Sequence, residues 1–155
     1  NDHIRMIIGL MAIIFCLDYY FRKDSDKPKK PSKFASYFWP SLSGFTSFSI
    51  HAGGLPLSFY LLPMRLDRTM YVATAGLFYL LINLFKIFPY AYLGEMNFEN
   101  IYTSLLLLPL APLGVYFGAY LVDKIGQDWF YKIGYFCTLL AGCKLFYDGS
   151  IKLFL

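Results

Sequence analysis

The stretch SIHAGGLP, residues 49–56, decides how this chain folds, because it interrupts an apolar segment that extends from residue 37 to residue 63. Two adjacent glycines and a proline lie at this point. Glycine disfavours a helix interior, and proline removes a backbone hydrogen-bond donor. The sequence therefore predicts one helix that stops near His51 and a second, short helix that begins just after the glycines, with Pro56 in its first turn.

The composition indicates that this broken segment lies in a membrane. Of the 155 residues, 57% are hydrophobic and 15% are charged, whereas a soluble domain carries about 25% charged residues. A soluble fold of this length leaves roughly a third of the unfolded chain's surface exposed, so it could not hide this many apolar side chains. We therefore expect an all-α, polytopic bundle of transmembrane helices, surrounded by the lipid bilayer of the cell membrane (plasma or inner membrane).

Charges and turn residues divide the chain into five apolar segments, and a helix that crosses a bilayer needs about 20 residues. We expect a first transmembrane helix over 1–21 and a basic cytoplasmic loop over 22–36. A membrane repeat is expected over 37–155, with the broken segment at 37–63 and helices at 70–93, 101–122 and 129–147. The chain begins with Asn1 rather than Met, which suggests a piece of a longer protein.

The loop at 22–33 is the strongest topological signal. It holds six basic and two acidic side chains, and this excess equals the net charge of +4 of the whole chain. Lysine and arginine accumulate on the cytoplasmic side of membrane proteins, so the loop is placed inside the cell. Topology alone accounts for the charge. A patch for nucleic acid or acidic lipids is the alternative interpretation of the loop, and of the two we expect no nucleic-acid partner.

Two topologies are open for segment 37–63, which either crosses the membrane or enters and returns as a re-entrant hairpin with residues 51–54 at its tip. The hairpin puts Arg65 and Arg68 on the same side as the basic loop, and it leaves the acidic stretch 94–100 outside. Crossing reverses both placements. The bias of positive charge toward the cytoplasm therefore favours the hairpin.

The broken segment is also the best candidate for a binding site. Unsatisfied polar groups in hydrocarbon cost several kcal/mol each, so a broken helix survives at membrane depth only against protein or a water-filled cavity. The start of a helix after the glycines would present free N–H groups and a positive dipole end to an anion, and nearby hydroxyls would add donors. The alternative is that His51 only hydrogen-bonds a neighbouring helix. We assign an anion site to Ser49, His51, Ala52, Gly53, Gly54 and Pro56.

Segment 70–93 contains a second candidate, since Lys86 is a cation inside an apolar stretch and Asn83 lies one turn before it. Lys86 could neutralise an anionic substrate, with Asn83 orienting it. The alternative is a lysine that extends to the membrane interface. Because Pro89 pushes the preceding residue out of helical geometry, we expect the helix to kink or unwind near Lys86.

The remaining patterns indicate packing rather than chemistry. Ala111, Gly114 and Gly118 repeat at a spacing of three and four, which predicts close helix packing on that face. The three cysteines have no metal-ligand spacing, and the sequence has no HExxH motif, no nucleophile elbow and no glycine loop for a nucleotide. We therefore expect no enzyme activity, no metal and no cofactor.

Several motifs resemble one family of permeases. These are GFTSFSIHAGGLP (44–56), YLLP (60–63), VAT (72–74), NLFKIFPY (83–90) and LLPLAPLG (107–114). Together they resemble the second half of the sulfite exporter TauE/SafE family, over residues 44 to about 149. Leu55 departs from the family's usual HAGGPP, which has proline there. The segment 4–33 would correspond to the last helix of the first half and the central loop.

The resemblance implies a permease built from two homologous halves that moves sulfite, sulfonates or related organosulfur anions across the membrane. It adds Thr74 to the substrate site. A repeat of one hairpin and three crossings has an odd number of spans, so its two copies would be inverted. The chain would then be the carboxyl-terminal half and would need a homologous first half or a second copy. The alternative is a small, non-transporting membrane subunit that packs against a partner through the Gly114 and Gly118 face.

Overall fold

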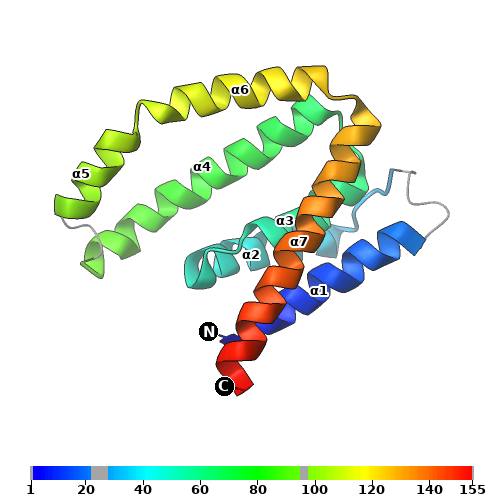
Figure 1. Ribbon diagram of the computed structural model, residues 1–155, viewed down its shortest axis with the longest axis horizontal. Coiled ribbons are helices and arrows are strands. Elements are labelled where there is room, and N and C mark those ends of the chain that lie inside the picture. Colours follow the sequence, from blue (N-terminus) through cyan, green and yellow to red (C-terminus); the bar gives the residue numbers. More distant parts are fainter. Residues whose placement is uncertain (1, 22–27, 95–97, 155) are drawn as a thin grey trace. The chain divides into compact units, whose positions relative to one another are not determined.

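The computed structural model describes residues 2–21, 28–94 and 98–154, and within these ranges the regular structure is entirely helical. The expected all-α fold is confirmed. Parts of the expected basic and acidic loops, residues 22–27 and 95–97, lie outside the described residues. The elements are α1 (Asp2–Phe21), α2 (Lys33–Ile50), α3 (Gly54–Leu61), the 3₁₀ helix η1 (Leu62–Met64), α4 (Arg68–Tyr92), α5 (Phe98–Leu107), α6 (Leu110–Lys124) and α7 (Gln127–Phe154) (Figure 1).

The chain forms two compact units. The first unit is discontinuous in sequence, since it combines Asn1–Asp67 with Asp128–Leu155 and so contains α1, α2, α3, η1 and α7. The second unit, Arg68–Gln127, contains α4, α5 and α6. Most of the residues expected at the anion site therefore belong to the first unit, and those expected near Lys86 belong to the second.

Glycines bring α1 and α7 into close contact in the first unit. A Cβ atom added to Gly9 would lie 2.5 Å from the backbone nitrogen of Phe146, and one added to Gly142 would lie 2.6 Å from the Cβ of Ala12. At the other end of the contact, a Cβ on Gly149 would lie 2.8 Å from the nitrogen of Met6. The two helices are therefore antiparallel and pack backbone to backbone, as small residues allow in membranes (Figure 1).

The core of the first unit forms where α3 meets α1. Ile8 and Ala12 of α1 are buried against Leu55 and Phe59 of α3. The Phe59 ring packs on Phe15, with ring centres 4.9 Å apart, and its other contact is the edge of a tryptophan of α2, Trp39, at 5.3 Å. The short helix α3 is thus held by apolar contacts to two long helices, which fixes the position of the turn that precedes it.

In the second unit, α4 runs without interruption from Arg68 to Tyr92 with Pro89 inside it. The unwinding expected near Lys86 is therefore not found. Proline removes only one backbone donor, and the other N–H groups have no better partner in an apolar environment than their own helix. The helix ends three residues later, where the Leu93 N–H donates to the Pro89 carbonyl at 2.9 Å and Gly94 takes a positive φ of 74°.

The stretch expected as one helix over 101–122 consists of two helices, α5 and α6, separated at Leu108 and Pro109. Pro109 has no N–H and disfavours the helical conformation of Leu108, so the break has a local cause. Helix α6 contacts α4. An added Cβ at Gly114 or Gly118 would meet no atom within 4 Å among the described residues. The close packing expected at this face is thus absent from the described part of the chain.

Two of the described helices, α1 and α4, are long and apolar enough to cross a membrane. The apolar stretch Gly54–Met64 is shorter. The break at Pro109 leaves α5 and α6 with 10 and 15 residues, below the about 20 residues that a crossing needs. The five apolar segments of the sequence therefore give fewer spanning candidates than their number suggested.

Replacing Gly142 by alanine tests the contact between α1 and α7. We expect Gly142→Ala to lower the free energy of unfolding by about 1–3 kcal/mol, because the new methyl group overlaps Ala12 and the helices must separate. Gly114→Ala is the matched control, since that site is open and alanine favours helix by up to about 1 kcal/mol. Denaturant unfolding in detergent measures both. Equal effects of the two substitutions would contradict the proposed packing.

Candidate functional site

The turn between α2 and α3 is the expected break, and it lies at the residues predicted from the sequence. Helix α2 ends at Ile50, and His51 follows in the left-handed region with a φ of 55°. The N–H groups of His51 and Ala52 both donate to the carbonyl of Thr46, which closes the end of the helix. Helix α3 then begins at Gly54, with Pro56 in its first turn.

Polar contacts hold α2 and α3 together as an antiparallel helical hairpin. Next to the turn, the Ser43 hydroxyl donates to the Gly53 carbonyl at 2.7 Å. Farther from the turn, the Tyr60 hydroxyl donates to the Ser36 hydroxyl at 3.2 Å. A Cβ atom on Gly53 would lie 2.6 Å from the Cβ of Ser47, so only glycine allows this approach. The two helices therefore approach closely at the turn and are also joined by side chains farther from it.

Two hydroxyl groups of α2 do not serve as donors to an anion, although the sequence had led us to expect this of the hydroxyls near the turn. Ser43 and Thr46 are fully buried, and their hydroxyls donate to backbone carbonyls: Ser43 to Gly53, and Thr46 to Leu42 at 2.9 Å. Buried hydroxyls need such partners, because an unsatisfied one costs free energy. We conclude that the Ser43 hydroxyl joins α2 to the start of α3, that the Thr46 hydroxyl bonds within α2, and that neither is a donor to a ligand.

The predicted anion-site residues divide into an accessible and a buried group. His51 and Gly54 are exposed, whereas Ser49 and Ala52 are half-buried. Gly53 and Pro56 are buried in the hairpin. Gly53 therefore serves close packing, and the accessible part of the turn consists of His51, Ala52 and Gly54.

The start of α3 supplies the chemistry expected of this turn. The first N–H groups of a helix have no partner within that helix, and the first hydrogen bond here runs from the Leu57 N–H to the Gly53 carbonyl at 3.4 Å. The N–H groups of Gly54 and Leu55 belong to this first turn. Such groups, with the positive end of the helix dipole, favour a negative charge.

The other predicted site residues, Thr74, Asn83 and Lys86, lie on α4 in the second unit. Thr74 and Asn83 are exposed and Lys86 is half-buried. Asn83 and Lys86 are three residues apart and share one face of the helix. Thr74 precedes Asn83 by two and a half turns, which places it on the opposite face, about 180° away.

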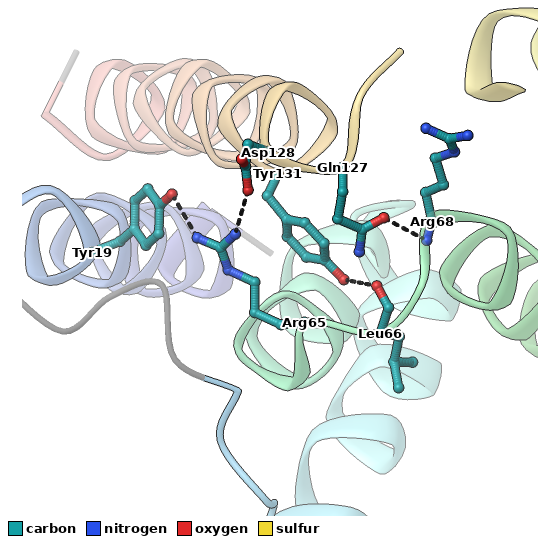
Figure 2. Close-up of polar contacts among 7 residues, drawn as sticks. All are labelled: Tyr19, Arg65, Leu66, Arg68, Gln127, Asp128 and Tyr131. Carbon is teal, nitrogen blue, oxygen red and sulfur yellow. Dashed lines mark hydrogen bonds and ion pairs between the residues drawn. The ribbon is translucent and has the colours of Figure 1, made fainter. Parts of the chain in front are cut away.

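Arg65 is a structural residue that the sequence analysis used only as a topological charge. It follows η1 in the left-handed region, with a φ of 49°, and its side chain is only 9% exposed. The guanidinium donates to the Tyr19 hydroxyl at 3.2 Å, lies 3.8 Å from the Asp128 carboxylate and packs over the Tyr131 ring at 4.8 Å (Figure 2). The Tyr131 hydroxyl in turn donates to the Leu66 carbonyl at 2.7 Å. This cluster joins the end of the hairpin to α1 and α7.

Arg68 has a corresponding role in the second unit. Its backbone N–H donates to the Gln127 side chain at 3.1 Å (Figure 2). Its guanidinium donates to the carbonyls of Asp123, at 3.2 Å, and of Ile125, just after the end of α6. A cation is favourable at a helix C-terminus, where carbonyls lack intrahelical partners. Arg68 thus connects the start of α4 to the end of α6.

The family to which the chain belongs follows from a comparison of its sequence with known protein families. The profile of the sulfite exporter TauE/SafE family matches residues 1–145. The chain belongs to the TauE/SafE family. The resemblance seen in the motifs of the second half is therefore confirmed, and the match also includes α1. No curated protein and no solved structure matches the chain.

Membership of the TauE/SafE family places the chain among membrane transporters of sulfite and related sulfur anions, and not among enzymes. The HAGGLP turn, which the sequence analysis compared with the family's HAGGPP, is the turn of the α2–α3 hairpin. Leu55 occupies the position of the family's first proline. It is buried, with 7% of its surface exposed, and packs in the core with Ile8 and Phe59.

Removing the Ser43 hydroxyl tests the hairpin of this TauE/SafE chain. We expect Ser43→Ala to lower the free energy of unfolding by about 1 kcal/mol, because the buried Gly53 carbonyl loses the shorter of its two hydrogen bonds and keeps only the one from the Leu57 N–H at 3.4 Å. Ser58→Ala is the control, since the Ser58 hydroxyl donates to Gly54 within α3 and joins no second helix. Unfolding in detergent followed by circular dichroism measures the difference. A Ser58 variant as unstable as the Ser43 variant would refute the role of this hydrogen bond.

Proposed function

We propose that this chain is the carboxyl-terminal half of a secondary permease that moves sulfite, sulfonates or related organosulfur anions across the cell membrane. Membership of the TauE/SafE family supports the assignment to transporters of sulfur-containing anions. The observation that supports the site is the exposed turn of the α2–α3 hairpin. Here His51 and Gly54 are accessible, and the first turn of α3 contains N–H groups without a partner in that helix. An imidazole and helix-start amides are together suited to an oxyanion.

In this proposal each unit supplies anion-binding groups of its own: the α2–α3 turn in the first unit and α4 in the second. Ser49, His51 and the amides of Gly54 and Leu55 donate hydrogen bonds to the sulfur-bound oxygens. On α4, Lys86 attracts an anion with Asn83 beside it, and Thr74 is the third proposed contact, on the opposite face of this helix. Alternating access would move one part of the bundle around this site, as in other transporters with broken helices.

We further propose that segment 37–63 is re-entrant and that the chain forms one of two inverted repeats. The length of the returning arm supports this, since the apolar stretch Gly54–Met64, made of α3 and η1, extends about 18 Å against a hydrocarbon core of about 30 Å. A single repeat provides one wall of a transport path. The chain therefore acts with a homologous first half or with a second copy of itself.

Flux measurements with two variants test the site. We expect His51→Ala and Lys86→Ala each to lower sulfite transport at least ten-fold in proteoliposomes, because each removes a proposed contact to the anion, and a charge-assisted hydrogen bond contributes about 1.5–3 kcal/mol. The vesicles contain the chain together with its homologous half, or the chain alone if it forms dimers. Uptake of labelled sulfite and of a simple sulfonate is measured.

His3→Ala and Lys132→Ala are the matched controls, because both residues are exposed and lie outside the proposed site. The controls should transport at the wild-type rate. Normal flux in the His51 and Lys86 variants would show that these residues are structural.

A second candidate function is a small, non-transporting subunit that packs against a partner protein through α6. The open face at Gly114 and Gly118 favours it, since added Cβ atoms there meet no described atom within 4 Å. Gly118→Leu should then lower the mass of the detergent-solubilised assembly, whereas Gly76→Leu, at an equally open position on α4, and His51→Ala should leave it unchanged. An unchanged mass for the Gly118 variant would eliminate this candidate.

A further inference from the structure

A shallow, open hollow lies along one face of α2, away from the turn that forms the candidate anion site. Its volume is about 560 Å³, and its lining includes Lys33, Phe34, Tyr37, Phe38, Leu42 and Phe45. The Phe34 and Phe38 rings stack with centres 5.5 Å apart and planes 15° from parallel. One end of the hollow is therefore a lysine, and the remainder is aromatic and aliphatic apart from Ser41.

The dimensions of the hollow match half of a bilayer. The part of α2 from residue 33 to residue 45 is about 18 Å long. The hydrocarbon layer of one leaflet is about 15 Å thick, which is close to this length. Its aromatic walls are open to the surroundings, since Phe34 is 74% and Phe45 56% exposed. A long, narrow apolar surface of this length fits an acyl chain that lies parallel to α2.

Positive charge gathers at the lysine end of the hollow. Residues 28–33 contain Lys29, Lys30 and Lys33 and no acidic side chain, and all three lysines are exposed. The Lys29 N–H donates to the Pro63 carbonyl at 2.9 Å, which attaches this segment to the end of the hairpin. Ser32 caps the start of α2 by accepting from the Ala35 N–H. The lysines and the helix start thus favour an anion at one defined end of the hollow.

We propose that this hollow binds one anionic phospholipid, with its acyl chain along the aromatic face of α2 and its phosphate at Lys29, Lys30 and Lys33. Topology accounts for basic residues in a loop but not for an apolar hollow that begins at the last of them. The cytoplasmic leaflet, where the positive-inside rule places these lysines, carries the anionic lipids of the membrane. Charge and shape therefore point to the same ligand.

Native mass spectrometry of the full chain in detergent tests this site, with dioleoylphosphatidylglycerol and dioleoylphosphatidylcholine as probes. Phosphatidylglycerol should bind more tightly. The triple variant K29Q/K30Q/K33Q should lose at least ten-fold in affinity for phosphatidylglycerol, because each lysine near an anionic surface contributes about five-fold. The matched control K124Q/K132Q/K144Q removes the same charge from exposed lysines elsewhere and should change the affinity less than two-fold.

A second pair of variants tests the apolar part. Phe34→Ala with Phe45→Ala should weaken phosphatidylglycerol binding at least three-fold, whereas Phe85→Ala with Phe88→Ala, at similarly exposed positions on α4, should not. Three results would overturn the proposal: equal binding of the two lipids, equal losses in the two lysine triples, or competition by glycerol phosphate as strong as by the whole lipid. The last result would assign the lysines to a free phosphate.

Discussion

The hydrogen bond from the Ser43 hydroxyl to the Gly53 carbonyl is the contact on which the hairpin depends. A chain that reverses direction in an apolar environment must satisfy the backbone groups of the turn without water. Here Thr46 accepts the N–H groups that follow α2, and Ser43 donates to the carbonyl that precedes α3. The absence of a side chain on Gly53 allows the two helices to come close enough for this exchange. The accessible turn is therefore held in place by two buried polar groups of α2, the Ser43 hydroxyl and the Thr46 carbonyl.

The hairpin could be predicted from the sequence because its signals are local. Two glycines and Pro56 define where one helix ends and the next begins, and the structure has the break at those residues. The separation of α5 from α6 was less evident, although Pro109 is an equally local signal. Pro89 and Pro109 both lie in apolar segments, yet only the second interrupts its helix. A single missing donor does not determine whether a helix continues, since neighbouring hydrogen bonds also contribute.

Long-range contacts could not be predicted in the same way. The glycines that bring α1 and α7 together are Gly9, Gly142 and Gly149, which form no short motif, whereas the GxxxG at Gly114 and Gly118 is open among the described residues. The charge of Arg65 was likewise evident from the sequence but its neighbours were not, because Tyr19 and Tyr131 come from distant parts of the chain. Within the candidate site, the accessible residues followed from the turn. A pattern of residues along one helix does not predict how that turn and Lys86 are arranged in the tertiary structure.

The discontinuous first unit has a consequence for the order of folding. The α2–α3 hairpin joins neighbouring segments, so it can form as soon as its residues leave the ribosome. The contact between α1 and α7 joins residues far apart in sequence, as in the hydrogen bond from the Cys16 thiol to the Tyr135 carbonyl across 119 positions. Because synthesis proceeds from the N-terminus, α1 waits for its partner until the whole of α4, α5 and α6 has been made. During that interval α1 can already pack on α3 through Ile8 and Ala12, but its face around Gly9 lacks the helix that covers it in the folded chain.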